Sequence, residues 1–338
     1  MKRYKTLYRM LPVWVLLLLT GLSSCDYIHD DIDPCKHYFR FAYTYNMKFA
    51  DAFTHEMINQ EKAKNVRLYI FDKEGSYLQT KLFEGETLQT NRYELDLEPG
   101  TYRLLAWGGL NETDYTWEEP AAGSSIEDFQ MSVKRSAQKS VNRELLGLFQ
   151  GEMTLEIPEE TSEHVMYLVK NTNKIRFIFI DPNTGTENWT KESFEVKVVT
   201  KNGDLAYDNT PVTDTAITWL PYYSALENVK GTDGASVYTA LCTELNTLRL
   251  VDTQAGDYLQ IRYAEEEEAF LSVDLTDFLS LTQMESHDLS RQEYLDRQDE
   301  YTVLVYVDVM GGKAHCLEVI VNDWVIRLND IDLGKEEL

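Results

Sequence analysis

The chain is poor in the residues and motifs that carry redox, phosphate or nucleophilic chemistry. It holds only four cysteines and six histidines in 338 residues, and no two cysteines stand in a C-x-x-C pair. A zinc ribbon or a thioredoxin-like redox motif is therefore not indicated. The sequence also lacks G-x-S-x-G, G-x-G-x-x-G and G-x-x-x-x-G-K, which excludes the usual signatures of serine hydrolases, dinucleotide-binding folds and P-loop enzymes.

Two stretches begin like metal motifs and then depart from them. His55-Glu56 could open an H-E-x-x-H zinc site, but Asn59 stands where the second histidine is required. Residues 330–334 (DIDLG) echo a calcium loop, but the glycine comes one residue early. We therefore predict no catalytic residue, no metal site and no cofactor.

Basic residues are scarce, with 32 Lys and Arg against 57 Asp and Glu and a formal charge of −25. An acidic surface repels phosphate backbones, so the composition argues against nucleic acid as a partner. Four of the basic residues precede Met10, and no acidic residue does. If residues 1–24 are removed, as argued next, the formal charge falls from −25 to −29.

Only one long apolar run is present, from Met10 to Leu22, and it is shorter than the roughly 20 residues that a membrane-spanning helix needs. Its basic start and the small residues after it are typical of a secretory signal. The sequence Leu22-Ser23-Ser24-Cys25 resembles the lipobox of bacterial lipoproteins. This resemblance implies cleavage between Ser24 and Cys25, with lipid on the Cys25 thiol. The alternative is an ordinary cleaved signal, with Cys25 as a half-cystine or as a residue without a special role.

Residues 25–36 are acidic and lack periodicity, which predicts a short tether. Acidic residues soon after a lipidated cysteine resemble the surface-export signal of Bacteroides-type bacteria. Once Cys25 is acylated, three thiols remain, and this odd number leaves the pairing among Cys35, Cys242 and Cys316 open.

From Phe39 to Tyr45, and in many later stretches, apolar or aromatic side chains recur with a period of two, the pattern of half-buried strands. Residues 66–71 and 77–83 flank Asp72-Lys73-Glu74-Gly75, which predicts a hairpin. Pro99-Gly100 predicts a type II turn, whereas residues 111–143 are polar and read as a long insertion. Further strands are expected at 148–157, 175–179, 194–199, 238–242, 247–251, 258–263, 269–273, 301–309 and 316–321.

Helical signals are few and short. Ser290-Arg291-Gln292-Glu293 fits a capping box, and residues 275–279 carry apolar side chains at helical spacing. Glu265 to Glu268 is interpreted as a charged hairpin turn. We therefore predict an all-β protein of two tandem β-sandwich domains with short helical insertions, at residues 37–160 and 161–338, joined by a linker at Glu159 to Glu163.

Several stretches together resemble the FimB-type fimbrial anchor lipoproteins of Bacteroides-like bacteria. They are the lipobox 22–25, DPC at 33–35, FAYTYNM at 41–47, VRLYIFD at 66–72, LEPGTY at 97–102, AWG at 106–108, QEYLD at 292–296 and IVNDW at 320–324. This resemblance implies that both sandwiches are transthyretin-like and that the protein holds a fimbria on the outer membrane, supporting adhesion.

The same resemblance implies two partners. The first shaft subunit of the fimbria would add a β-strand to this protein, and the acyl chains on Cys25 would enter the membrane. Main-chain hydrogen bonds and alternating side chains give such strand addition its strength and selectivity. The acidic tail, residues 329–338, shows no donor-strand pattern, so the chain is expected to receive a strand without donating one.

Alternative functions remain open at this point. A shaft or tip subunit of a fimbria would use related domains, with the 111–143 insertion as a tip-binding region. A surface glycan-binding lipoprotein could use Trp117, Trp189 and Trp219 as a sugar platform, although aromatic residues more often serve cores and interfaces. An enzyme is the least favoured reading, because the catalytic motifs are missing.

Overall fold

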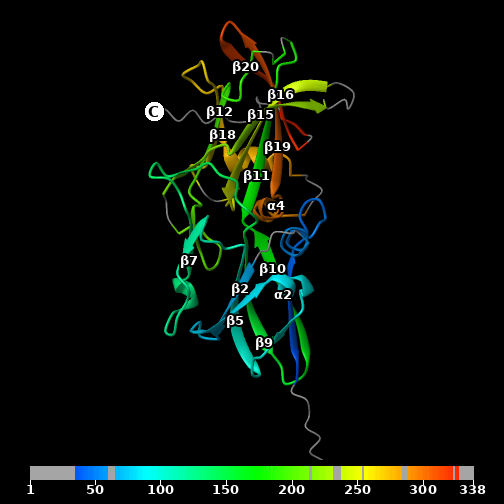
Figure 1. Ribbon diagram of the computed structural model, residues 1–338, viewed down its shortest axis with the longest axis vertical. Helices are drawn as coiled ribbons and strands as arrows, with labels where there is room; N and C mark the ends of the chain where they lie inside the picture. The colour runs from blue at the N-terminus through cyan, green and yellow to red at the C-terminus, as the bar shows by residue number, and fades with distance from the viewer. Residues whose placement is uncertain are drawn as a thin grey trace, which may run out of the picture.

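The computed structural model describes residues 35–59, 65–183, 185–186, 188–212, 215–230, 237–252, 255–283, 288–322 and 324–326. Ser24, Cys25, most of the predicted tether and the 329–338 tail lie outside the described residues. Figure 1 shows an elongated molecule with two β-rich units along its long axis. Within the described residues, no helix is both long and apolar enough to cross a bilayer.

The first unit is built on a seven-stranded sheet in the order β3-β2-β5-β9-β10-β1-β4. Its strands are β1 (His37–Tyr43), β2 (Asn65–Asp72), β3 (Tyr77–Glu84), β4 (Tyr93–Leu95), β5 (Gly100–Gly108), β9 (Phe149–Ile157) and β10 (Ser162–Lys170). All seven strands contribute side chains to one apolar core, so the sheet curls around it. Two short helical elements, η1 (Thr54–Ile58) and α2 (Gly85–Thr90), add Met57 and Leu88 to this core.

The alternation read from the sequence holds in this sheet. Phe39, Phe41 and Tyr43 of β1 all point into the core. The hairpin predicted between β2 and β3 is confirmed, and Gly75 in its turn has a φ of +89°, a conformation that favours glycine. The type II turn expected at Pro99-Gly100 is wrong, because Gly100 lacks a positive φ and instead begins β5, paired with Ile157.

β10 continues the first sheet beyond the expected boundary at residue 160. It pairs in parallel with β1 along all seven β1 residues, and its end pairs with β9. Glu159 to Glu163 is therefore the β9–β10 connection and the start of β10, and not an interdomain linker. We propose a division at Asn171, between β10 and β11 (Thr172–Ile180).

The second unit contains two sheets that face each other. The larger has the order β15-β16-β11-β19-β20-β21 and the smaller β18-β17-β12-β14-β8. Their bounds, besides β11, are β8 (Ser140–Val141), β12 (Phe194–Thr200), β14 (Ile217–Trp219), β15 (Tyr223–Lys230), β16 (Val237–Leu248), β17 (Tyr258–Tyr263), β18 (Leu271–Asp274), β19 (Glu300–Met310), β20 (Lys313–Val321) and β21 (Trp324–Ile326). Both sheets contribute to one core, which confirms an all-β sandwich.

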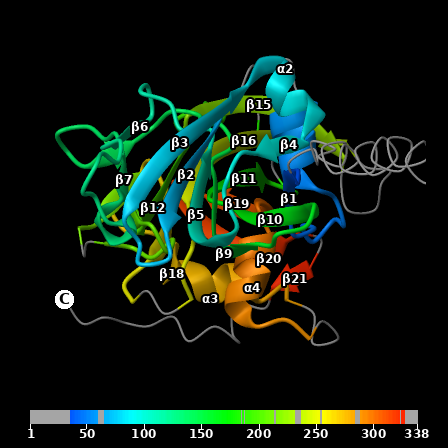
Figure 2. The same ribbon diagram turned by 90° about the horizontal axis from the view of Figure 1, so that it is seen from below.

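Two helices accompany this unit, α3 (Leu275–Ser280) and α4 (Arg291–Arg297), and Figure 2 shows them side by side. The helical spacing at 275–279 and the cap at Ser290 are both confirmed, since Ser290 Oγ accepts a hydrogen bond from Glu293 N at 3.1 Å. The strand expected at 238–242 lies within one long strand, β16, which ends at Leu248, so the separate strand expected at 247–251 is wrong.

The 111–143 region is not a loop insertion. It contains β6 (Tyr115–Trp117), η2 (Ile126–Asp128), β7 (Gln130–Val133) and β8. β7 pairs with β6 and with β13 (Asp204–Ala206), and β8 pairs with β14. In Figure 2, β6 and β7 lie on one side of β2 and β5, and β1 and β4 on the other.

The three-stranded sheet of β6, β7 and β13, together with Phe129 just before β7, covers the second face of the first sheet. Trp107 of β5 stacks on Phe129 with ring centroids 5.9 Å apart, and Tyr69 of β2 lies 5.1 Å from the same ring. Trp107 and Tyr69 belong to the same apolar cluster as the core of the second unit. The two units are therefore joined through a continuous apolar layer.

A buried carboxyl just ahead of β17 makes stability depend on pH. Asp257 is 1% exposed; Lys201 N donates to its Oδ1 at 3.1 Å, and Oδ2 has no hydrogen-bond partner within the described chain. Burial raises the pKa of Asp257 to about 7. As the pH rises from about 4 to about 7, the unfolded chain loses this proton before the folded chain, so this group lowers the free energy of unfolding.

We predict that Asp257→Asn gains stability over the wild type as the pH rises from 4 to 7. The gain reaches up to about 4 kcal/mol, at about 1.4 kcal/mol for each pKa unit. Urea unfolding at several pH values measures it, with the exposed Asp96→Asn as control. A constant difference between Asp257→Asn and the wild type across this range would contradict the prediction.

The core position of β1 gives a second prediction. Phe41 is fully buried, with its ring centroid within 6 Å of the rings of Phe39, Phe53, Phe83 and Tyr93. Phe41→Ala should lower the free energy of unfolding by about 3–5 kcal/mol, because it removes apolar contacts and leaves a cavity.

The control for Phe41→Ala is Tyr45→Ala, just beyond β1, where the side chain is 59% exposed. Tyr45→Ala should change the free energy of unfolding by no more than about 0.5 kcal/mol. Similar urea midpoints for the two variants would show that β1 does not belong to the core.

Candidate functional site at the junction of the two units

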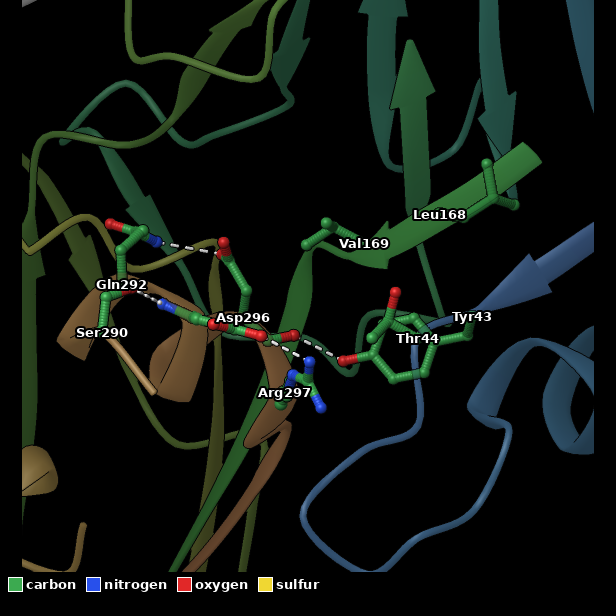
Figure 3. A pocket seen from close by; sticks show the side chains of 9 residues that line it. Tyr43, Thr44, Leu168, Val169, Ser290, Gln292, Asp296 and Arg297 are labelled. Atoms are coloured by element: carbon green, nitrogen blue, oxygen red, sulfur yellow. Dashed lines mark hydrogen bonds and ion pairs between the residues drawn. The ribbon is translucent and has the colours of Figure 1, made fainter. Parts of the chain in front are cut away.

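The end of β1 is bonded directly to the second unit. Tyr43 Oη donates to Asp296 O at 2.5 Å, as Figure 3 shows, and Met47 N donates to Arg297 O at 3.1 Å. Lys48 Nζ forms an ion pair with Glu300 at 2.6 Å. Burial, together with the nearby Asp299 and Asp296 carboxylates, raises the pKa of Tyr43 above its usual value, so its hydroxyl remains a donor.

α4 is held in place to receive these contacts. Tyr294 and Leu295 are buried in the core of the second unit. Asp296 accepts two hydrogen bonds from Arg249, at 2.7 and 2.9 Å, and a third from Gln292 at 3.0 Å. This pairing of a guanidinium with a carboxylate is strong and directional, so it fixes the helix against the segment that follows β16, where Arg249 lies.

A pocket of about 320 Å³ lies between β1, β10 and α4 (Figure 3). It is lined by Tyr43, Thr44, Leu168, Val169, Ser290, Gln292, Glu293, Asp296 and Arg297. Its two carboxylates already have partners, because Asp296 binds Arg249 and Glu293 pairs with Arg297. The pocket therefore joins the units and offers no pair of free acid and base groups for catalysis.

A buried cation lies on the same junction. Lys170, the last residue of β10, is 9% exposed, and its ammonium group contacts Glu56 of η1 and, at 3.0 Å, Asp299 just before β19. Burial alone would lower the pKa of Lys170, but the carboxylates of Asp299 and Glu56 raise it overall. The charged lysine thus bridges three elements of the two units.

These junction residues were not predicted from the sequence. Lys170 follows Met166 and Leu168 at the inward positions of β10, so a lysine in the apolar phase of an alternating strand was the available signal. Its partners Glu56 and Asp299 lie 114 and 129 residues away in the sequence. No local pattern connects them.

The residues singled out in the sequence do not form a site. Cys35 is exposed, Cys242 buried and Cys316 half-buried, and all three are free thiols. The part of the chain that the structure describes contains no group of three or more His, Cys, Asp or Glu residues suited to a metal ion.

The proposed tryptophan sugar platform is wrong. Trp219 is fully buried and donates to Thr200 Oγ1 at 2.8 Å, and Trp189 is only 6% exposed. Both serve the core of the second unit, whereas Trp117 is half-buried in β6, with the Arg67 guanidinium 5.0 Å from its ring centroid. Three rings in these settings cannot present one exposed flat surface.

Comparison with known proteins gives a consistent picture. A family model described as fimbrillin-A associated anchor proteins Mfa1 and Mfa2 matches residues 32–330. The crystal structure of a candidate polysaccharide-binding protein from Bacteroides thetaiotaomicron is 28% identical with a TM-score of 0.72, over 88% of this chain and 99% of that one. No curated protein matches the chain.

Two further solved structures are similar. A candidate adhesin from Bacteroides thetaiotaomicron is 27% identical with a TM-score of 0.75, over 88% of this chain and 100% of that one. The fimbrial anchor protein Mfa2 from Porphyromonas gingivalis is 17% identical with a TM-score of 0.62, over 87% and 99%. At that identity, the likeness to Mfa2 shows a shared fold.

We predict that Lys170→Met strongly destabilises the protein. The variant leaves Glu56 and Asp299 facing each other without their cation, which should lower the free energy of unfolding by about 3–5 kcal/mol. Lys36→Met is the control, because the exposed Lys36 side chain pairs with the exposed Glu94, and its loss should change the free energy of unfolding by less than about 1 kcal/mol. Equal urea midpoints for the two variants would contradict the bridging role.

Proposed function

The chain belongs to the family of fimbrillin-A associated anchor proteins, and from that premise we propose that it is a lipid-anchored outer-membrane protein that holds a fimbria on the cell surface. The family match over residues 32–330 carries this proposal. The family is of the fimbrial anchor and adhesin type and not an enzyme family.

The membrane end of the proposed anchor is Cys25. The basic start, the apolar run and Leu22-Ser23-Ser24-Cys25 support cleavage before Cys25 and acylation of its thiol. Two or more acyl chains hold a protein durably, because each buried methylene contributes about 0.8 kcal/mol. The acidic residues after Cys25 support exposure on the outer leaflet.

The fimbrial end of the proposed anchor works by strand addition. The first shaft subunit would add an extended segment to an open sheet edge of this chain, and main-chain hydrogen bonds would hold it. Within the described residues each sheet ends in strands with a single neighbour, so both units offer edges to which a strand could be added.

Glycan binding is a second candidate function. It is favoured by one similar structure, which is described as a candidate polysaccharide-binding protein. The burial of Trp189 and Trp219 removes the platform that the sequence offered for it. We therefore rank it below anchoring.

Electron microscopy of a deletion strain, with its culture medium probed for shed fibres, tests the anchor role. Fibres should be absent from the cells and abundant in the medium, and the wild-type gene should restore attachment. Cys25→Ala should fail to restore it, because the protein then lacks the acyl anchor. Unchanged attached fibres in the deletion strain would overturn the proposal.

A further inference from the structure

The smaller sheet of the second unit has an internal edge that is only half paired. β17 runs along β12 from Phe194 to Val199, but on the other side β14 pairs only with Val198 to Thr200. After Trp219 the chain leaves β14, and by Tyr222 it has joined the larger sheet, where Tyr222 N donates to Glu244 O of β16. Ahead of Val198, no strand of the described residues pairs with this side of β12.

The register shows which backbone groups face the open side. Ala264 N donates to Ser193 O, so in this antiparallel pair the odd-numbered residues of β12 direct their N–H and C=O groups toward β17. Successive residues alternate in this respect. The backbone groups of Phe194 and Val196 therefore face away from β17, as do those of Val198 and Thr200, which meet β14.

A cavity of about 570 Å³ lies beside this open edge. All four consecutive residues from Phe194 to Lys197 line it, although Phe194 and Val196 point their side chains into the core and Glu195 and Lys197 point outward. Gln260 and Arg262 of β17 line it too, so the cavity extends from the outer face of the smaller sheet to this side of β12. Asn142, Leu220 and Pro221 line it as well.

The charge of the cavity lining differs from that of the whole chain. Three basic residues line the cavity, Lys191, Lys197 and Arg262, but only two acidic ones, Glu195 and Glu267. The chain as a whole has a formal charge of −25. Arg262 is paired with Glu195, but Lys197 is exposed and has no carboxylate partner within the described residues. A partner side chain opposite Lys197 would therefore gain from being acidic.

We propose that the β12 edge from Phe194 to Lys197 is the docking site for an extended segment of the fimbrial shaft subunit. The segment continues the line of β14 along β12, over about 13 Å at 3.3 Å per residue. It bonds the backbone groups of Phe194 and Val196 that face away from β17, and it places an acidic side chain beside Lys197. The shaft subunit as partner rests on the proposed function, whereas the strand-binding edge rests on the geometry.

The chemistry of the edge favours a peptide over a sugar. Backbone N–H and C=O groups that alternate along a strand are matched by another extended backbone. Among the described residues that line the cavity, Phe194 is the one aromatic residue, and it offers no stacking surface, because it is 4% exposed and packs flat on Phe179, with ring centroids 4.4 Å apart.

Photo-crosslinking in fimbriated cells tests the partner. p-Benzoylphenylalanine is placed at Lys197, and, as a matched control, at Lys73, an exposed lysine in the β2–β3 turn of the first unit. We expect a crosslinked product with the shaft subunit at position 197 and none at 73. No product at 197, or equal products at both positions, would overturn the assignment.

Calorimetry on the purified protein tests the edge without fimbriae. The probe is the acetylated, amidated peptide (Val-Asp)4, with (Val-Lys)4 as its charge-reversed control. Binding should weaken about fivefold or more in Lys197→Glu, because attraction becomes repulsion, and stay within twofold in Lys73→Glu.

Two variants of (Val-Asp)4, one N-methylated at every valine and the other at every aspartate, distinguish strand pairing from charge attraction. N-methylation removes backbone N–H donors and leaves the charges unchanged. In a strand only one of the two sets of N–H groups faces β12, so one of these peptides should lose binding and the other keep it. If both bind as well as the parent, or if the parent does not bind, the edge is not a strand acceptor.

The two proposals can fail independently. Shed fibres in the deletion strain without a crosslink at 197 would leave the anchor role standing and reject the β12 edge. Attached fibres in that strain with specific peptide binding at the edge would reject the anchor role, and with it the shaft subunit as partner.

Discussion

The insertion of β1 between β10 and β4 is the constraint on which the rest of this structure depends. The strand supplies Phe39, Phe41 and Tyr43 to the first core and pairs along its whole length with β10. It also ends at the second unit, where the Tyr43 hydroxyl meets the backbone of α4. One strand thus closes the first unit and positions the second.

The junction around β1 combines apolar and charged contacts. The small sheet of β6, β7 and β13 carries an apolar layer from the first sheet into the second core, while Lys170, Glu56 and Asp299 form a buried charged bridge. A buried pair of this kind adds little net stability but penalises any arrangement that separates its members. The apolar layer joins the units, and the charged bridge favours one arrangement of them.

Sequence patterns predicted much of this architecture where side-chain alternation was regular. β17 has the bounds 258–263 that its alternation indicated, and the cap at Ser290 was read from four residues. β16 was split in two because Thr243, Glu244 and Asn246 interrupt its apolar pattern. These polar residues are buried, since partners distant in sequence satisfy them: Arg176 for Glu244, and the Asn173 carbonyl for Asn246.

The strands within 111–143 were missed for a related reason. β6, β7 and β8 have two to four residues each, too few to establish a period of two. β7 and β8 pair with β13 and β14, which come about 70 residues later, so this pairing depends on contacts that local sequence does not encode. The bridge at Lys170 was hidden in the same way, because only one of its three members departs from its local pattern.

The direction of β1 has a mechanical consequence. In the proposed anchor, tension from a fimbria reaches the membrane through the start of this strand, at His37, and acts along the strand axis. All seven residue pairs with β10 and the three with β4 are then loaded in shear at the same time, instead of opening one after another. A chain attached to the membrane at a loop or at the end of a hairpin would unzip pair by pair under the same pull.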